Sequence, residues 1–473
     1  MNEINKTKLS NKNRTIIFIV FLVGLFISGV NAGFIGPVLP IIENTLQVSS
    51  RLSSWVYTTY LLLFVIGSPI LAKISENQGK KKAFIISLLT FLMGTSLIVI
   101  GKSSIICIII GRWLQGFGGG GIHPVASAFV GDYYPPQKRG MLLGIVSTIF
   151  GFSTICGPLL ASFIIPFGWE WLFIINIPML IILIIFSYYY IPNFETSRKL
   201  NIDKIGSILL IIVASSLSIG INQIDSNNFI PSIFSKDILL LFIVFIVALV
   251  LLIKLENRSE KPIVPIHMFK NKDIKTATEI IFIYGLGETI EIYIPSFTIV
   301  AMNLSYTDAS LLMLPSLITF TSASLLVGKL TDKYGSRILI KTGLISLLIG
   351  LIIMLTYSSN MILFIIGEIF ESYGLLTIVA SPIRYIVLCE TSFGDRNSGQ
   401  AILNMSNYIA RIIGGALIGG LIASFSGTIM GYNIYYIFII IMAIIALILS
   451  FRLKNHEEQL ETMYEIHEKQ KIN

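Results

Sequence analysis

Charged residues are scarce in this 473-residue sequence: they make up 13% of it, whereas 54% of the residues are hydrophobic. A soluble domain has about 25% charged residues, so the composition excludes a string of ordinary soluble domains. It excludes a disordered chain as well, because disordered segments contain little apolar surface. Apolar runs of about 18 residues or more, enough to cross a membrane as helices, recur along the chain. The composition therefore predicts an all-α polytopic membrane protein.

Cysteine is also rare, and Cys107, Cys156 and Cys389 have neither disulfide nor metal-site spacing. The sequence has no His-Glu-x-x-His, Cys-x-x-Cys, Gly-x-Ser-x-Gly or Walker A motif. The glycine run 118–121 lies inside an apolar run and lacks the Lys-Ser/Thr of a phosphate-binding loop. We therefore expect neither an enzyme nor an ATP-driven pump, and neither a metal nor another cofactor.

Fourteen apolar runs have the length of a membrane-spanning helix. They lie at 16–42, 53–74, 83–101, 104–131, 141–166, 169–191, 205–224, 237–256, 275–302, 308–330, 338–358, 360–387, 400–424 and 432–453. Because fourteen is an even number, both ends of the chain are expected on the same side of the membrane.

Lysine and arginine are concentrated in alternate loops, which indicates the orientation. Three lysines at 80–82 follow the second run, whereas the loops of the opposite side hold only Arg51, Lys102 and Lys236. Cytoplasmic loops carry such an excess of basic residues. The net charge of +8 therefore reflects orientation and not nucleic-acid binding. We expect a multi-pass protein of the cell membrane with both termini in the cytoplasm.

Two of the basic loops resemble each other. The first runs from Ala72 to Lys81 and contains Glu76 and Gly79; the second runs from Gly328 to Arg337 and contains Asp332 and Gly335. In both loops an acid precedes a glycine by three residues and basic residues follow. A glycine allows a tight turn with positive φ, and the acid can cap a helix or pair with a base. We interpret both as gating loops.

The two loop glycines are 256 residues apart, whereas the first six runs need only about 190 residues. The excess of ~60 residues equals two helices with their links. We therefore expect a six-helix bundle in 1–195, two inserted helices in 196–258, a second six-helix bundle in 259–454 and a cytoplasmic tail in 455–473. A repeat in a chain without large loops points to a secondary transporter with its cavity between the halves.

Four segments follow recognisable motifs. They are Gly328–Arg337 (G-x-L-x-D-x-x-G-x-R/K), Arg112–Gly118 (R-x-x-Q-G-x-G), Gly151–Ser162 with Gly157 and Pro158 (a motif ending in G-P-x-x-G-G) and Trp169–Pro178 (W-R-W-x-F-x-I-N-I-P). These segments resemble motifs of the major facilitator superfamily, in its fourteen-helix drug:proton antiporter branch, where the third is the antiporter motif. The chain as a whole is similar to the Gram-positive tetracycline and quaternary-ammonium exporters, which implies their 6+2+6 fold.

The chain departs from the pattern of this branch at several positions. The glycine pair that ends the antiporter motif is replaced by Ala161 and Ser162, and the first loop has Glu76 where the family has aspartate. The first helix of the branch carries an acid about nine residues before its A-L-P, where this sequence has Asn31. If that acid takes part in proton coupling, the protonation site of this chain lies elsewhere.

Arg112 lies within the run 104–131, next to Gln115. Placing an arginine at membrane depth costs at least ~2.5 kcal/mol, so we first interpret Arg112 as a functional residue. The resemblance implies that Arg112 lines the cavity near the coupling site. The alternative is a side chain that reaches the outer interface, since the run begins only a few residues earlier.

Four glutamates lie within apolar runs. Glu288 and Glu291 are three residues apart and share a helix face, as do Glu368 and Glu371. Four carboxylates at such depth cannot all be ionised without partners, so we expect at least one to carry protons. One alternative is a structural network in which Arg411 neutralises one glutamate; another places Glu291 and Glu368 in a wet outer vestibule.

His123 and two glycine pairs complete the candidates. His123 follows the glycine run and is either a proton relay or a structural residue beside Pro124. The pairs Gly116/Gly120 and Gly415/Gly419 have the spacing that lets helices approach closely.

The leading hypothesis is a proton-coupled exporter of amphipathic, cationic or zwitterionic drugs that works by alternating access. The alternative is a symporter or exporter for one physiological solute on the same fold. A non-transporting membrane enzyme or sensor would need an interfacial catalytic cluster or a large soluble appendage, and the sequence has neither. The expected partners are a small amphipathic substrate, protons and the lipid bilayer, and we expect a monomer driven by the proton gradient.

Overall fold

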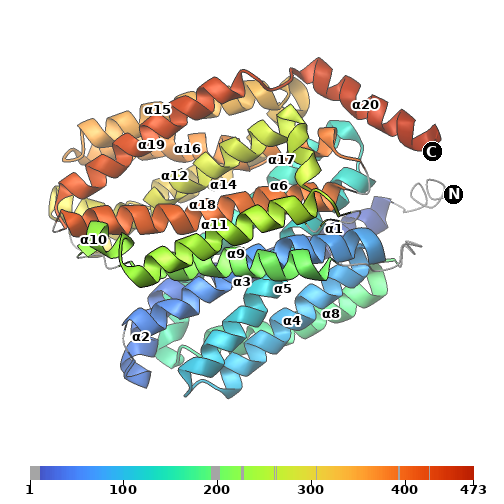
Figure 1. Cartoon of the computed structure of the whole chain (residues 1–473). Helices are drawn as coiled ribbons and strands as arrows, with labels where there is room; N and C mark the ends of the chain where they lie inside the picture. Colours follow the sequence, from blue (N-terminus) through green and yellow to red (C-terminus); the bar gives the residue numbers. More distant parts are fainter. Residues whose placement is uncertain are drawn as a thin grey trace.

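The computed structural model describes residues 11–472, apart from 49, 193–202, 225–227, 260–261, 263, 305, 393–394 and 426. The described residues form α-helices and short 3-10 turns and contain no strand. Figure 1 shows long, roughly aligned helices, with the start of α1 and the whole of α20 at the same end of the bundle. We call this end the terminus side.

The helices follow one another with short connections. The first group is α1 (Asn11–Gly33), α2 (Ile35–Leu46), α3 (Ser50–Gln78), α4 (Lys80–Ile100), α5 (Ile105–Tyr133), α6 (Pro136–Ile164), α7 (Trp171–Ile174) and α8 (Asn176–Tyr190). Next come α9 (Lys204–Asn222), α10 (Phe229–Ile233) and α11 (Lys236–Glu256). The last group is α12 (Lys272–Met302), α13 (Tyr306–Leu311), α14 (Leu314–Tyr334), α15 (Ser336–Thr356), α16 (Met361–Val379), α17 (Pro382–Glu390), α18 (Arg396–Ser424), α19 (Ile429–Ser450) and α20 (His456–Ile472).

Ten helices of the described chain are long and apolar enough to cross a membrane, or twelve if each of two bent pairs forms one span. The bends lie within α12 (50°) and α14 (43°). The sequence predicted fourteen spans. The two that are not among these twelve are helical all the same: they are α6, of 29 residues, and α9, of 19 residues. The structure thus shows an all-α protein with ten to twelve candidate spans.

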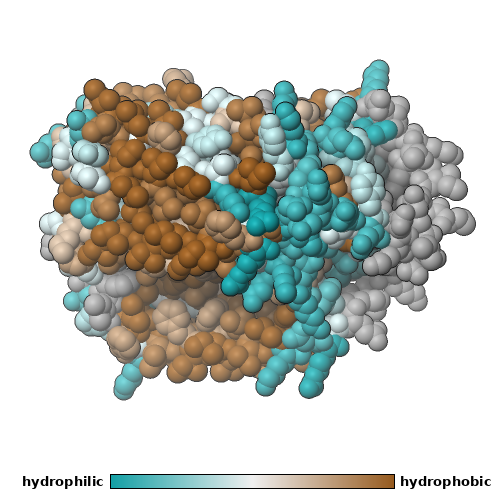
Figure 2. Space-filling view, turned by 90° about the horizontal axis from the view of Figure 1, so that it is seen from above, coloured by the Kyte–Doolittle hydropathy of each residue, from teal (hydrophilic) through white to brown (hydrophobic). Residues whose placement is uncertain are grey.

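Apolar side chains cover the sides of the bundle. Ile106, Ile182, Leu240 and Ile318 are each more than half exposed. Figure 2 shows a broad hydrophobic surface, with hydrophilic residues gathered towards the terminus side. Soluble monomers rarely expose apolar patches of this extent, and a bilayer solvates them. The surface agrees with a multi-pass membrane protein.

The helices of the first group, α1–α8, are called the early helices, and those of the last group, α12–α20, the late helices. They contact each other along two interfaces, which we call seams. Helix α3 packs on α18, and α6 packs on α14. Helices α9 and α11 pair with each other, and α9 also contacts α3 and α18, so the pair lies over one of the seams (Figure 1). One hydrophobic cluster, between Ala277 and Leu453, draws only on the late helices.

Local backbone chemistry accounts for the turns and for one bend. Gly79 (φ 91°) and Gly335 (φ 78°) separate α3 from α4 and α14 from α15, as the loop repeat predicted. Both conformations are in the region that favours glycine. The bend in α12 follows Glu291, whose carbonyl lies four residues before Pro295, a residue with no N–H to donate.

The two predicted glycine pairs behave differently. A Cβ at Gly116 or Gly120 would lie 2.3 Å from the backbone oxygen of Tyr60 or Phe64 on α3, so this pair allows close packing of α3 and α5. A Cβ at Gly415 would meet nothing within 4 Å, and one at Gly419 only a tyrosine hydroxyl at 3.5 Å. The predicted packing role of the second pair is therefore wrong, because no backbone of the described chain approaches that face of α18.

Candidate functional site

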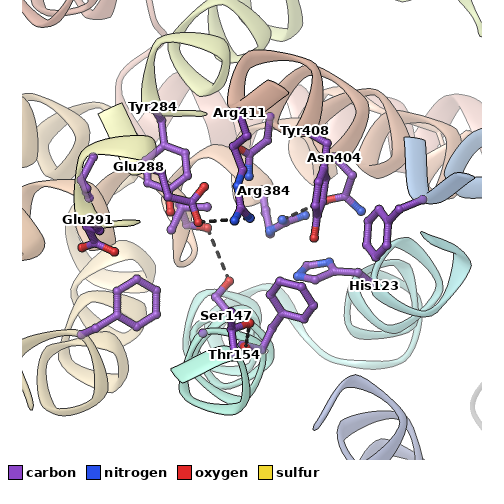
Figure 3. A pocket seen from close by; sticks show the side chains of 17 residues that line it. His123, Ser147, Thr154, Tyr284, Glu288, Glu291, Arg384, Asn404, Tyr408 and Arg411 are labelled. Carbon is purple, nitrogen blue, oxygen red and sulfur yellow. Dashed lines mark hydrogen bonds and ion pairs between the residues drawn. The ribbon is translucent and has the colours of Figure 1, made fainter. Parts of the chain in front are cut away.

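A cavity lies between the early and the late helices. Its wall comes from α3, α5 and α6 on one side and from α12, α14, α16, α17 and α18 on the other (Figure 3). Apolar atoms make up most of the wall's surface, and charged, amide, hydroxyl and imidazole side chains supply the rest. Small-molecule sites combine an apolar wall with such polar groups. The lining residues are Phe64, His123, Ser147, Phe150, Gly151, Thr154, Tyr284, Glu288, Glu291, Phe320, Leu375, Val379, Arg384, Asn404, Asn407, Tyr408 and Arg411.

Glu288 and Arg411 form an ion pair inside the cavity. The Arg411 Nη1 lies 3.5 Å from the Glu288 Oε1, and both side chains are largely buried. The guanidinium also lies 5.4 Å from the centre of the Tyr408 ring. The sequence left open whether Arg411 neutralises a glutamate, and the structure identifies Glu288 as its partner. The pair joins α12 to α18 and remains in contact with the cavity.

Glu291 also lines the cavity, one turn further along α12. Among the described residues, no basic side chain forms an ion pair with it. Because α12 bends by 50° just after this residue, Glu291 is the last residue of the straight segment that starts at Lys272. The sequence paired it with Glu288 on one face, and the structure brings both to the same cavity.

Glu368 and Glu371 on α16 are fully buried and are not part of the cavity wall. The Ser316 hydroxyl donates to the Glu368 Oε1 at 2.7 Å, and the Ser372 hydroxyl donates to the Glu371 Oε2 at 3.3 Å. The other oxygen of each carboxyl has no hydrogen-bond partner within the described chain. The alternative of a wet outer vestibule is therefore wrong for Glu368, because α14 and α15 cover this face of α16.

Arg112 is fully buried, which excludes a side chain that reaches the interface. It donates through Nη1 to the Asn31 backbone oxygen (3.2 Å) and the Gln115 side chain (3.0 Å), and through Nε to the Val56 oxygen (3.2 Å). Its guanidinium lies 4.1 Å from the Tyr60 ring centre. Arg112 does not line the cavity, contrary to the expectation, because it points from α5 towards α1 and α3.

Asn31 and Gln115 complete this network. The Gln115 amide donates to the Thr95 hydroxyl at 2.8 Å, and the Asn176 amide donates to the Asn31 Oδ1 at 3.4 Å. The neutral amide residue Asn31 is thus beside Arg112. Every partner described for Arg112 is uncharged.

The acids of the two repeated loops cap helices across the seams. Asp332 accepts hydrogen bonds from the backbone N–H groups of Gly140 (2.6 Å) and Met141 (2.9 Å), near the start of α6. Glu76 accepts one from the Ser398 N–H (2.7 Å), near the start of α18. Negative charge at a helix N-terminus is stabilising. Both contacts hold the early and late helices together on the terminus side.

The remaining residues that the sequence analysis singled out are Arg337, Gly157, Pro158 and His123. Arg337 donates to the Phe451 backbone oxygen at 3.0 Å and does not contact the capping acid of its own loop. A Cβ at Gly157 would lie 2.5 Å from the Phe34 nitrogen, so α6 approaches the α1–α2 junction closely there. Pro158 follows inside α6. His123 lines the cavity and lies 3.4 Å from the Ser127 hydroxyl through its Nδ1.

Two buried arginines were missed by the sequence reasoning. Arg384 on α17 lines the cavity and donates to Gln400 (3.2 Å) and Asn404 (3.0 Å) on α18. Arg396 at the start of α18 pairs with Asp132 on α5 at 2.9 Å, across the seam. The signal for Arg384 was present, since it is a basic residue inside the apolar run 360–387.

Comparisons with known proteins identify relatives of the chain. The model of the Major Facilitator Superfamily matches residues 21–270 and 277–466. Multidrug resistance protein 3 of Bacillus subtilis is 32% identical over 307 residues, which span 64% of this chain and 58% of that protein. Multidrug transporter protein MdtP of the same organism is 26% identical over 423 residues, which span 88% of this chain and 77% of that protein.

Solved structures show the same fold. The proton:xylose symporter XylE matches with a TM-score of 0.67 at 14% identity, over 94% of this chain and 97% of that one. The human organic anion transporter MFSD10 matches with a TM-score of 0.64 at 12% identity, over 93% and 100%. At these identities the likeness concerns the fold alone.

Proposed function

Because this chain belongs to the major facilitator superfamily, it is a membrane transporter and not an enzyme, and we propose that it exports amphipathic drugs in exchange for protons. The drugs are cationic or zwitterionic, and the proton gradient supplies the energy without a cofactor. The observation that carries the proposal is the cavity itself, where aromatic walls enclose the Glu288–Arg411 pair and Glu291. Relatives named as multidrug transporters support the same reading.

The proposed mechanism depends on carboxyl groups in the cavity that both the substrate and protons can reach. A substrate cation and a proton compete for the same oxygen atoms, so binding of one favours release of the other. Glu288 and Glu291 line the cavity and are therefore the groups at which we expect this competition. Glu368 and Glu371 are buried behind the cavity wall, and we consider them the next candidates for carrying protons.

A transporter for one physiological solute is the second candidate. The observation that favours it is Asn31, a neutral residue beside Arg112 where the drug-exporting branch carries an acid. A broad range of exported compounds supports the first candidate, and a single exported or imported metabolite supports the second.

We also propose the finer architecture. The chain crosses the cell membrane fourteen times as a monomer, with α6 and α9 as the two further spans. At a rise of ~1.5 Å per residue, 29 and 19 residues reach about 43 and 28 Å, close to or beyond the hydrocarbon thickness. The divisions 1–195, 196–258, 259–454 and 455–473 then describe two bundles, an inserted pair and a tail. The basic residues of the terminus side favour a cytoplasmic location for both ends.

Asp332→Asn is expected to slow export about three- to tenfold while substrate binding in detergent stays within about twofold. The carboxylate accepts two backbone hydrogen bonds from α6, and a charged acceptor contributes more than a neutral one, about 1.5–3 kcal/mol. Loss of this charge weakens the contact with α6 and favours conformations that are open on the terminus side. The populations of the conformational states therefore change, whereas the substrate-binding cavity does not. Efflux from cells and binding to purified protein measure the two effects. Normal export by this variant would mean that the loop is only a topological anchor.

The proposed function is tested by substrate-dependent proton flux in proteoliposomes. The purified chain is reconstituted with a pH-sensitive dye inside, and a panel of lipophilic cations, tetracyclines and fluoroquinolones is added under an imposed pH gradient. We expect several compounds to accelerate proton movement, in the direction opposite to their own. Flux in the same direction as a single solute supports the second candidate, and no flux with any compound contradicts proton-coupled export.

A further inference from the structure

The four charged side chains of the cavity are not equivalent. Glu288 and Arg411 neutralise each other. Arg384 is only 4% exposed, and within the described chain no carboxylate forms an ion pair with it. Among the described residues no basic side chain forms an ion pair with Glu291 either. The cavity therefore has one guanidinium and one carboxyl group without an ion-pair partner.

Arg384 keeps donors available for a ligand. A guanidinium has five N–H bonds, and the contacts to Gln400 and Asn404 use one on each terminal nitrogen. The Nε–H is buried and has no partner among the described residues. The side chain is held in place by two neutral amides, which fix its orientation and leave its charge uncompensated. An oriented guanidinium binds carboxylates with two parallel hydrogen bonds.

Figure 3 shows how the two unpaired groups lie. Glu291 is at one end of the cavity, and Arg384 is towards the other, near Asn404 and His123, with the Glu288–Arg411 pair between them. Aromatic rings, among them those of Tyr284 and Tyr408, line the part of the cavity that separates Glu291 from Arg384. The cavity thus offers an anion site, a cation site and an aromatic wall to one molecule.

We propose that the preferred substrates are aromatic zwitterions, whose carboxylate binds Arg384 and whose cationic group binds Glu291. This inference rests on the proposed export function and narrows its substrate class. Burying an isolated charge is unfavourable, and a ligand that brings both counter-charges removes the cost at both ends. A purely cationic ligand leaves Arg384 uncompensated and places a further positive group in a cavity that already has two arginines.

The competing interpretation is a structural Arg384 that only clamps α17 to α18 through Gln400 and Asn404. In that case the loss of its charge affects every ligand alike. A zwitterion site predicts a selective loss, for ligands with a carboxylate only. A matched acid and ester therefore separate the two interpretations.

Rhodamine 110 and rhodamine 123 are such a pair, because rhodamine 123 is the methyl ester of rhodamine 110 and both carry the same cationic ring system. Binding to the purified full-length chain in detergent is measured by fluorescence anisotropy. The variants are Arg384→Gln, which removes the charge, Arg384→Lys, which retains it, and Glu291→Gln. Arg452→Gln is the control, since Arg452 is exposed just after α19 and is not part of the cavity wall.

We expect the wild-type chain to bind the acid at least about fivefold more tightly than the ester. Arg384→Gln should abolish this preference by weakening the acid alone, and Glu291→Gln should weaken both dyes. Arg384→Lys should keep only part of the preference, because lysine retains the charge but not the paired N–H donors. The control should match the wild type. Equal affinity of the wild type for the two dyes, binding of neither, or an equal loss of both in Arg384→Gln overturns the proposal.

Export assays with the same dyes separate this proposal from the function on which it rests. Export of rhodamine 123 without any preference for the acid contradicts the zwitterion site and leaves drug export intact. A charge-dependent preference for the acid without proton-driven movement of either dye supports the site and contradicts the export function.

Discussion

Glu288→Gln is expected to reduce proton-driven export by at least about tenfold while substrate binding remains measurable. Glutamine keeps the size and most of the hydrogen bonding of the side chain but cannot take up a proton. Glu288 lines the cavity and forms an ion pair with Arg411 at 3.5 Å, so the loss of its charge leaves that guanidinium without its ion-pair partner. Downhill exchange of substrate does not require a net proton transfer and should survive the substitution.

The measurement is efflux from proteoliposomes with and without an imposed pH gradient, compared with exchange at equal substrate concentrations. Glu279→Gln is the matched control on the same helix, because Glu279 is half-exposed, does not line the cavity and, among the described residues, forms an ion pair only with Lys275, at 3.9 Å. Arg411→Ala should alter the pH profile of export as well, since Glu288 then loses its counter-charge. If glutamine at 288, 291, 368 and 371 in turn leaves the rate and the pH profile unchanged, coupling lies in the early helices, with His123 and Asp132 as the next candidates.

Gly116→Ala is expected to lower the thermal stability of the protein strongly, whereas Gly415→Ala should leave it unchanged or raise it. The Cβ of alanine at 116 would lie 2.3 Å from the Tyr60 carbonyl oxygen, a backbone atom that can move only if α3 and α5 separate. Overpacking of this kind typically costs about 1–3 kcal/mol or more. At 415 nothing lies within 4 Å, and alanine favours a helix over glycine by about 1 kcal/mol.

The two alanine variants are a matched pair, because each adds one methyl group to a long helix. Size-exclusion chromatography after heating, with fluorescence detection, measures the fraction that stays folded. Gly120→Ala should behave like Gly116→Ala, since its Cβ would lie 2.3 Å from the Phe64 carbonyl oxygen. Equal melting temperatures for the variants at 116 and 415 would contradict the close packing of α3 and α5.

The sequence by itself determined the features that a bilayer imposes locally. In hydrocarbon a backbone must satisfy its own hydrogen bonds, so each apolar run is a helix whatever packs against it. Each of the fourteen runs is mostly helical in the structure, although 16–42, 169–191, 308–330 and 360–387 each extend over two helices. Ten to twelve spans qualify by length and composition. The positive-φ turns at Gly79 and Gly335 and the bend before Pro295 are likewise properties of single residues.

Only the tertiary structure decided which polar groups meet. Spacing placed Glu288 with Glu291 and Glu368 with Glu371 on shared faces, but a helix face does not reveal what packs against it. In the fold one pair lines the cavity and the other lies behind the wall. Arg112 pointed towards α1 instead of the cavity, and Arg384, overlooked in an apolar run, became part of its lining. These assignments depend on contacts between residues that are tens to hundreds of positions apart, and the membrane constrains each helix without specifying its neighbours.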